Sequence, residues 1–121
     1  MKQVGVGMGL DFSHCNARWS YSGFGRFRNR LADQIGFKEY EHICTTDDPR
    51  YEKIKDDGLL PFLAHSDCDG GLTTEECLKV APRLRELLSS WSDDDRDKIN
   101  GLELCEGMEL AASKNEILEF L

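Results

Sequence analysis

Residues 65–76, HSDCDGGLTTEE, place oxygen-bearing side chains and glycines at intervals that suit a bound divalent cation. Counted from the first residue, carboxylates stand at the third and fifth positions, glycines at the sixth and seventh, a hydroxyl at the ninth and a glutamate at the twelfth. Carboxylate, hydroxyl and carbonyl oxygens are the ligands that Ca²⁺ prefers. The metal ligands predicted by this spacing are Asp67, Asp69, the carbonyl of Gly71, Thr73 and Glu76.

The spacing resembles that of a twelve-residue EF-hand calcium loop, with one departure. His65 stands at the first position, where the EF-hand has a carboxylate, and imidazole suits borderline transition metals better than Ca²⁺. Thr73 and Glu76 also match the capping box T-x-x-E at the start of a helix. EF-hands normally come as two helix-flanked loops, and this chain contains one such segment. A calcium site and a metal-free turn before a capped helix are therefore alternative interpretations.

A second group of residues combines guanidinium and aromatic side chains. The window from residue 12 to residue 32 contains no acidic residue but has four arginines and five aromatic residues, in a chain of net charge −8. Guanidinium groups bind phosphate through paired N–H donors, and aromatic rings stack on nucleobases. We therefore expect a site for a small anionic ligand such as a nucleotide. Alternatively, the arginines pair with distant acids and the aromatic side chains form core. The predicted ligand-binding residues are Arg18, Trp19, Tyr21, Arg26, Arg28, Arg30 and, from the loop above, His65.

Histidine and cysteine residues that lie close together raise a third hypothesis, a small hydrolase. His14 and Cys15 are neighbours, and His65, Asp67 and Cys68 fall within one short segment. Thiolate, imidazole and carboxylate groups are the components of a nucleophilic site. However, the sequence contains no G-x-S-x-G, H-E-x-x-H or Walker-type motif. We therefore expect a binding protein rather than an enzyme.

Length and composition predict one globular domain spanning residues 1–121. A chain of 121 residues with 40% hydrophobic content buries a modest core without covalent cross-links. The five cysteines are odd in number and form no C-x-x-C motif, so we expect reduced thiols and a cytoplasmic location, with Cys77 and Cys105 in the core. No apolar run is long enough to cross a membrane, and no membrane partner is expected. The acidic net charge argues against binding a nucleic-acid polymer, because it repels phosphates.

Hydrophobic periodicity predicts an α+β domain in which a few-stranded antiparallel or mixed sheet packs against about three helices. Phe24, Phe27 and Leu31 are the predicted core face of the first long helix. Ser22 and Ser92 are the predicted N-caps of the first and last helices. The predicted strands span 4–12, 18–21, 37–45, 59–64 and 117–121, and the predicted helices span 24–35, 49–55, 74–91 and the residues that follow Ser92.

Three segments resemble those of a group of small bacterial and phage proteins that carry no assigned activity. The segments are Trp19 to Phe24 (WSYSGF) with the following Phe27-Arg28 and Leu31-Ala32, His65 to Gly70 (HSDCDG), and Pro82 to Leu87 (PRLREL). The resemblance covers most of the chain and implies a single stand-alone domain. It implies no mechanism.

These features together predict a non-enzymatic protein that binds a phosphate-bearing nucleotide or a nucleotide-derived signal. Some phage proteins of this size sequester the nucleotide signals of bacterial immune systems, which suggests phage counter-defence as a setting by analogy. Calcium binding through residues 65–76 is the alternative, and calcium is the one cofactor that the sequence suggests. A homo-oligomer is compatible with each of these functions.

Overall fold

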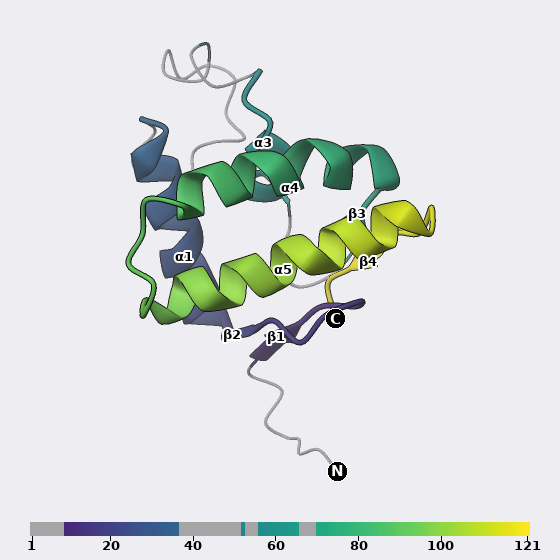
Figure 1. Cartoon of the computed structure of the whole chain (residues 1–121), viewed down its shortest axis with the longest axis horizontal. Helices are drawn as coiled ribbons and strands as arrows, with labels where there is room; N and C mark the ends of the chain where they lie inside the picture. Colours follow the sequence, from purple (N-terminus) through teal and green to yellow (C-terminus); the bar gives the residue numbers. More distant parts are fainter. Residues whose placement is uncertain (1–8, 37–51, 53–55, 66–69) are drawn as a thin grey trace.

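The computed structural model describes residues 9–36, 52, 56–65 and 70–121. Within these ranges, α4 and α5 lie side by side and α1 stands at one end of the pair (Figure 1). β1 pairs with β2 and β3 pairs with β4, both antiparallel. This arrangement confirms the predicted small α+β domain with about three helices. The helices are α1 (Tyr21–Gln34), α3 (Leu60–Leu63), α4 (Thr74–Leu88) and α5 (Arg96–Ser113), and the strands are β1 (Gly9–Asp11), β2 (Arg18–Ser20), β3 (Gly71–Leu72) and β4 (Leu118–Glu119).

An aromatic cluster forms the centre of the core. Phe24, Phe27 and Leu31 are fully buried on one face of α1, as their spacing predicted. Trp19 of β2 stacks on Phe27 with ring centroids 4.7 Å apart, and Phe62 of α3 meets Phe24 edge to face at 5.6 Å. Burial of a side chain of this size contributes about 1.5–3 kcal/mol. The cluster therefore fixes the position of α1 against β2 and α3.

Two cysteine side chains complete the core from the other helices. Cys77 of α4 and Cys105 of α5 are buried, as predicted from their positions on apolar stripes. Burial raises the pKa of both thiols, to about 12 for Cys105. Cys15, Cys77 and Cys105, the cysteines in the described part of the chain, are free thiols.

The three long helices begin at hydrogen-bonded caps, although two of the predicted caps are wrong. Thr73 and Glu76 form the predicted capping box of α4, in which each side chain accepts the backbone N–H of the other. α1 begins after Ser20 rather than Ser22, because the Ser20 hydroxyl accepts from Gly23 N. α5 begins after Asp95 rather than Ser92. A carboxylate at that position accepts two backbone N–H groups and complements the helix dipole.

The strand predicted over residues 59–64 is wrong, because this segment forms the short helix α3. Pro61 lies in its first turn, where a backbone N–H has no intrahelical partner, so a proline costs little there. Apolar residues over such a short stretch fit a buried helix as well as a buried strand. The expected strands at 4–8 and 37–45 lie outside the described residues, as does the expected helix at 49–55 apart from Glu52.

The two ends of the described chain meet beside α5. Phe12 and Phe120 form an antiparallel bridge, and Leu121 N donates to Asp11 O at 2.8 Å. In β1 and β2, Leu10 pairs with Trp19 and both side chains are buried. None of the helices described here is long and apolar enough to cross a membrane.

Candidate functional site

A groove is lined by residues of β2, of the first turns of α1 and of the first turns of α5. These three elements meet at the lower left of Figure 1. The volume of the groove is about 920 Å³. The groove is lined by residues from all three elements and from the loop before β2. The lining residues with charged or hydrogen-bonding side chains are Asn16, Arg18, Trp19, Ser20, Arg26, Arg96, Asp97, Asn100 and Glu103.

One wall of the groove is β2, which α5 holds in place through a side-chain amide. Asn100 accepts a hydrogen bond from Arg18 N at 3.0 Å through Oδ1 and donates one to Arg18 O through Nδ2. This pair of bonds leaves the side chain of Arg18 exposed at the groove, where its Nε lies 3.3 Å from Asp11 Oδ1. Because both partners of that ion pair are exposed to water, the pair contributes at most about 1 kcal/mol. Arg18 is therefore positioned by its backbone and not by a strong side-chain partner.

Arg26 of α1 and Arg96 of α5 are exposed and also line the groove. Neither makes a side-chain hydrogen bond or an ion pair with any residue that the structure describes. Arg83 and Arg85 differ, because they form ion pairs with Asp57 and Glu109 at 2.9 and 2.7 Å. The groove therefore brings together two arginines whose guanidinium groups are open to a ligand.

The two carboxylates that line the groove are partly engaged by the protein. Asp97 accepts hydrogen bonds from Trp19 Nε1 and from Arg30 Nη1, both at 3.1 Å. Glu103 Oε2 accepts from the backbone N–H of Asn16 at 3.1 Å. These bonds offset part of the negative charge that would repel an anion.

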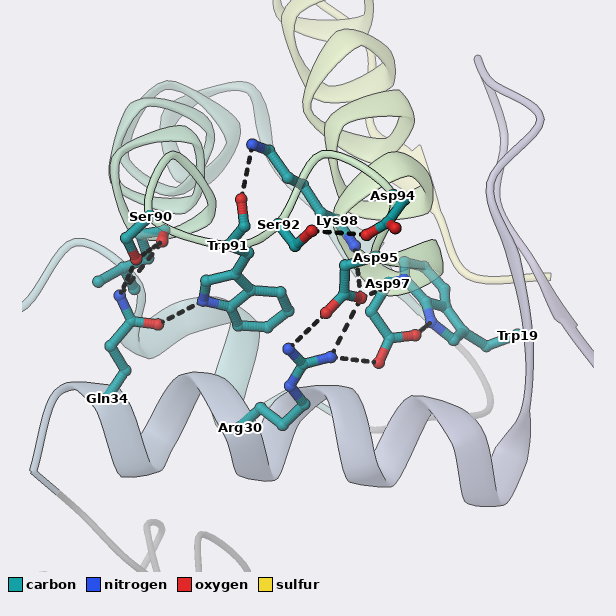
Figure 2. Close-up of polar contacts among 11 residues, drawn as sticks. Trp19, Arg30, Gln34, Ser90, Trp91, Ser92, Asp94, Asp95, Asp97 and Lys98 are labelled. Carbon is teal, nitrogen blue, oxygen red and sulfur yellow. Dashed lines mark hydrogen bonds and ion pairs between the residues drawn. The ribbon is translucent and has the colours of Figure 1, made fainter.

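Arg30, a predicted ligand-binding residue, connects α1 to the start of α5 (Figure 2). Its Nη2 donates to Asp95 at 2.7 Å and its Nη1 donates to Asp97 at 3.1 Å. The guanidinium also lies 3.8 Å from the centroid of Trp91, whose Nε1 donates to Gln34. The hydrogen bond from Arg30 lowers the pKa of Asp95. These contacts give Arg30 a structural role in which Nη1 and Nη2 already donate to carboxylates.

Arg28, a second predicted ligand-binding residue, is buried beneath α3. Its Nη1 donates to Phe62 O at 2.8 Å and to His65 O at 2.6 Å. Its guanidinium carbon lies 4.7 Å from the centroid of Phe24. A cation at the C-terminal end of a helix satisfies carbonyls that have no intrahelical donor. Arg28 therefore anchors the end of α3 to α1.

The predicted aromatic residues also lie mostly inside the fold. Trp19 is 7% exposed and stacks on Phe27, so its ring faces are not open to a nucleobase. Tyr21 is half-buried at the start of α1 and packs against the core. Of the predicted set, Arg18, Trp19 and Arg26 line one groove.

Arg96 is a groove residue that sequence reasoning did not identify. It lies far along the chain from the arginine-rich window and directly follows the acidic run that ends at Asp95. The available signal was its position in the first turn of a helix, which is where a bound anion is favoured. Only tertiary structure shows that this turn lies beside β2.

The predicted calcium loop is described in part. His65 stacks on Phe120 with centroids 4.2 Å apart, and its Nε2 lies 3.1 Å from Gly71 O. Gly70 has φ +80°, a conformation that favours glycine. Asp67 and Asp69 lie outside the described residues. Among the residues that are described, no group of three metal-binding side chains comes together.

The residues of the hydrolase hypothesis are likewise only partly described, because Asp67 and Cys68 fall in the same undescribed segment. The ring nitrogens of His14 lie 2.6 Å from Ser13 Oγ and 2.7 Å from Glu116 Oε1, so both have partners other than Cys15. Burial raises the pKa of the Cys15 thiol, which disfavours the nucleophilic thiolate.

Comparisons of the chain with protein-family models, with curated proteins and with solved structures gave no match.

Proposed function

We propose that the groove binds a small phosphate-bearing ligand, a nucleotide or a nucleotide-derived signal, without catalysing a reaction on it. The observation that carries this proposal is the convergence of Arg18, Arg26 and Arg96, from three separate elements, on one groove of a protein with net charge −8. A local concentration of positive charge on an acidic protein attracts anions to that surface in preference to others.

The chemistry of the groove supports phosphate in particular. Guanidinium groups present N–H donors in a planar fork that matches phosphate oxygens. Ser20 and Gly23 at the start of α1 also line the groove, and the first turn of that helix contains no acidic residue. The positive end of the helix dipole therefore adds to the arginine charges. Among the residues that the structure describes, Arg26 and Arg96 have no hydrogen bond or ion pair that a ligand must displace.

We propose phage counter-defence as the cellular setting. A cytoplasmic protein with reduced thiols would meet nucleotides at high concentration, and sequestration of a nucleotide signal in phage counter-defence needs binding alone. The resemblance to small bacterial and phage proteins favours that setting. A nucleic-acid polymer and a membrane are not among the proposed partners.

Calorimetric titration of the full chain tests the proposal. We expect heat from nucleoside monophosphates and from cyclic dinucleotides, but not from the uncharged nucleosides. The affinity should fall as salt is raised, because the arginine-phosphate attraction is screened. Equal binding of nucleosides and nucleotides would contradict a phosphate site, as would no binding of any phosphate compound.

A second candidate function is calcium binding through residues 65–76, favoured by one specific observation. Gly70, at the position where a calcium loop requires a sharp turn, has φ +80°. In this proposal Glu76 and Gly71 supply oxygens together with Asp67, Asp69 and Thr73.

For this calcium site we expect millimolar Ca²⁺ to raise the melting temperature of the wild type, since binding to the folded state alone stabilises it. Glu76→Gln should abolish that increase while keeping an oxygen for the Thr73 N–H of the capping box. Glu75→Gln is the matched control, because this exposed neighbour occupies no ligand position. A melting temperature that calcium leaves unchanged in the wild type would rule the site out.

A further inference from the structure

One face of α5 carries three different kinds of side chain along the groove. Arg96, Ile99 and Glu103 all line it, at intervals of three and four residues that keep them on the same side of the helix. Seven residues of helix separate Arg96 from Glu103, which corresponds to about 10 Å along the axis. Along this face of α5 the groove carries a guanidinium group at one end, an aliphatic side chain in the middle and a carboxylate at the other end. Asp97 also lines the groove beside Arg96, but it is bonded to Trp19 and Arg30.

The middle and the negative end are exposed to a ligand. Ile99 is 57% exposed, so its aliphatic surface is open to a ligand. Glu103 is half-buried and uses Oε2 to accept the Asn16 N–H. Its Oε1 has no hydrogen-bond partner within the described ranges of the chain. A carboxylate has about four lone-pair sites, so Glu103 retains several acceptor positions.

We propose that this row of side chains reads the base of the bound nucleotide and selects guanine. The inference rests on the proposed function, since it assumes that the arginine end holds the phosphate. The distance from Arg96 to Glu103 then matches the length of a mononucleotide. The sugar and the face of the base lie on Ile99, and the far edge of the base meets Glu103.

The choice of guanine follows from donors and acceptors. The Watson–Crick edge of guanine presents two adjacent donors, N1–H and the 2-amino group, and an ionised carboxylate accepts from both. Adenine presents one donor beside the unprotonated N1, whose lone pair repels a carboxylate oxygen. Hydrogen bonds to charged groups are the strong ones, and an unmatched buried group is costly. Glu103 therefore favours guanine and disfavours adenine.

The test is calorimetric titration of the full chain with GMP, IMP and AMP. We expect the wild type to bind GMP at least about tenfold more tightly than AMP, as one charge-assisted hydrogen bond implies. IMP, which has N1–H but no 2-amino group, should fall between them. Glu103→Gln should reduce the preference for GMP over AMP to within about twofold. If the oxygen of the new side-chain amide still accepts the Asn16 N–H, the amide NH₂ group faces the base and cannot accept from guanine.

Glu106→Gln is the matched control. Glu106 is an exposed residue on the same helix that does not line the groove, so its replacement removes the same charge without touching the base. The GMP preference should survive in this variant. Suppose that the wild type binds GMP and AMP with equal affinity and that replacing Arg26 and Arg96 abolishes the binding of both. That result would overturn the guanine assignment and leave the proposed phosphate binding intact. Failure of every nucleotide to bind would overturn both.

Discussion

Replacing Arg28 with alanine is expected to lower the free energy of unfolding by about 3–4 kcal/mol, the largest effect of any arginine substitution in the described chain. The side chain is 4% exposed, and it holds the carbonyls of Phe62 and His65. Without it those carbonyls lose a charged donor inside the protein, and α3 loses its anchor to α1. Urea denaturation monitored by circular dichroism measures the change.

Two further variants separate this role from a general effect of charge. Arg26→Ala removes the same charge from an exposed position of the same helix and should change stability by less than about 0.5 kcal/mol. Arg28→Lys keeps a charged N–H donor but loses the planar guanidinium group with its several donors. This variant should therefore recover part of the unfolding free energy that Arg28→Ala loses, and it should remain folded for measurement. An Arg28→Ala protein as stable as the wild type would contradict the anchoring role.

Removing Arg26 and Arg96 together should weaken nucleotide binding by about 2–4 kcal/mol, with charged hydrogen bonds taken at roughly 1.5–3 kcal/mol each and reduced for exposure and non-additivity. That range corresponds to a loss in affinity of about 30-fold to 1000-fold. Fold stability should change far less, because neither side chain has a partner among the described residues. Titration of the double variant with GMP measures the loss.

The matched control is Lys79→Ala combined with Lys114→Ala. Both lysines are exposed and lie outside the groove, so this variant has the same change in net charge. Its affinity for GMP should stay close to that of the wild type. An equal loss in the two double variants would indicate long-range electrostatic attraction and not a site at Arg26 and Arg96.

Sequence patterns predicted the helices well where a pattern was compatible with only one kind of local structure. The spacing of Phe24, Phe27 and Leu31 identified the buried face of α1, and the T-x-x-E pattern identified the start of α4. The residues around Pro61 were compatible with two kinds of local structure. A short apolar run with a proline fits a buried strand or the first turn of a short helix, and packing against Arg28 is a tertiary contact that no local pattern encodes.

The candidate site could be predicted only in part, because it too depends on tertiary contacts that no local pattern encodes. The acid-free window drew attention to Arg18 and Arg26, which line the groove. The sequence could not separate them from Arg28 and Arg30, because that sorting depends on which side of α1 meets α3 and which meets the start of α5. Arg96 lies on α5, and its contribution depends on how α5 packs against β2.

The most direct test of the central claim is a map of ligand-induced chemical-shift changes in the ¹⁵N-labelled full chain titrated with GMP. A ligand in the groove should shift the amide signals of Arg18, Ser20, Gly23, Arg96 and Asn100 in a saturable manner and leave those of the distant helix α3 unchanged. The same titration with guanosine should produce much smaller changes. Saturable shifts confined to another surface, or no shifts at millimolar GMP, would contradict the proposal that this groove binds a nucleotide.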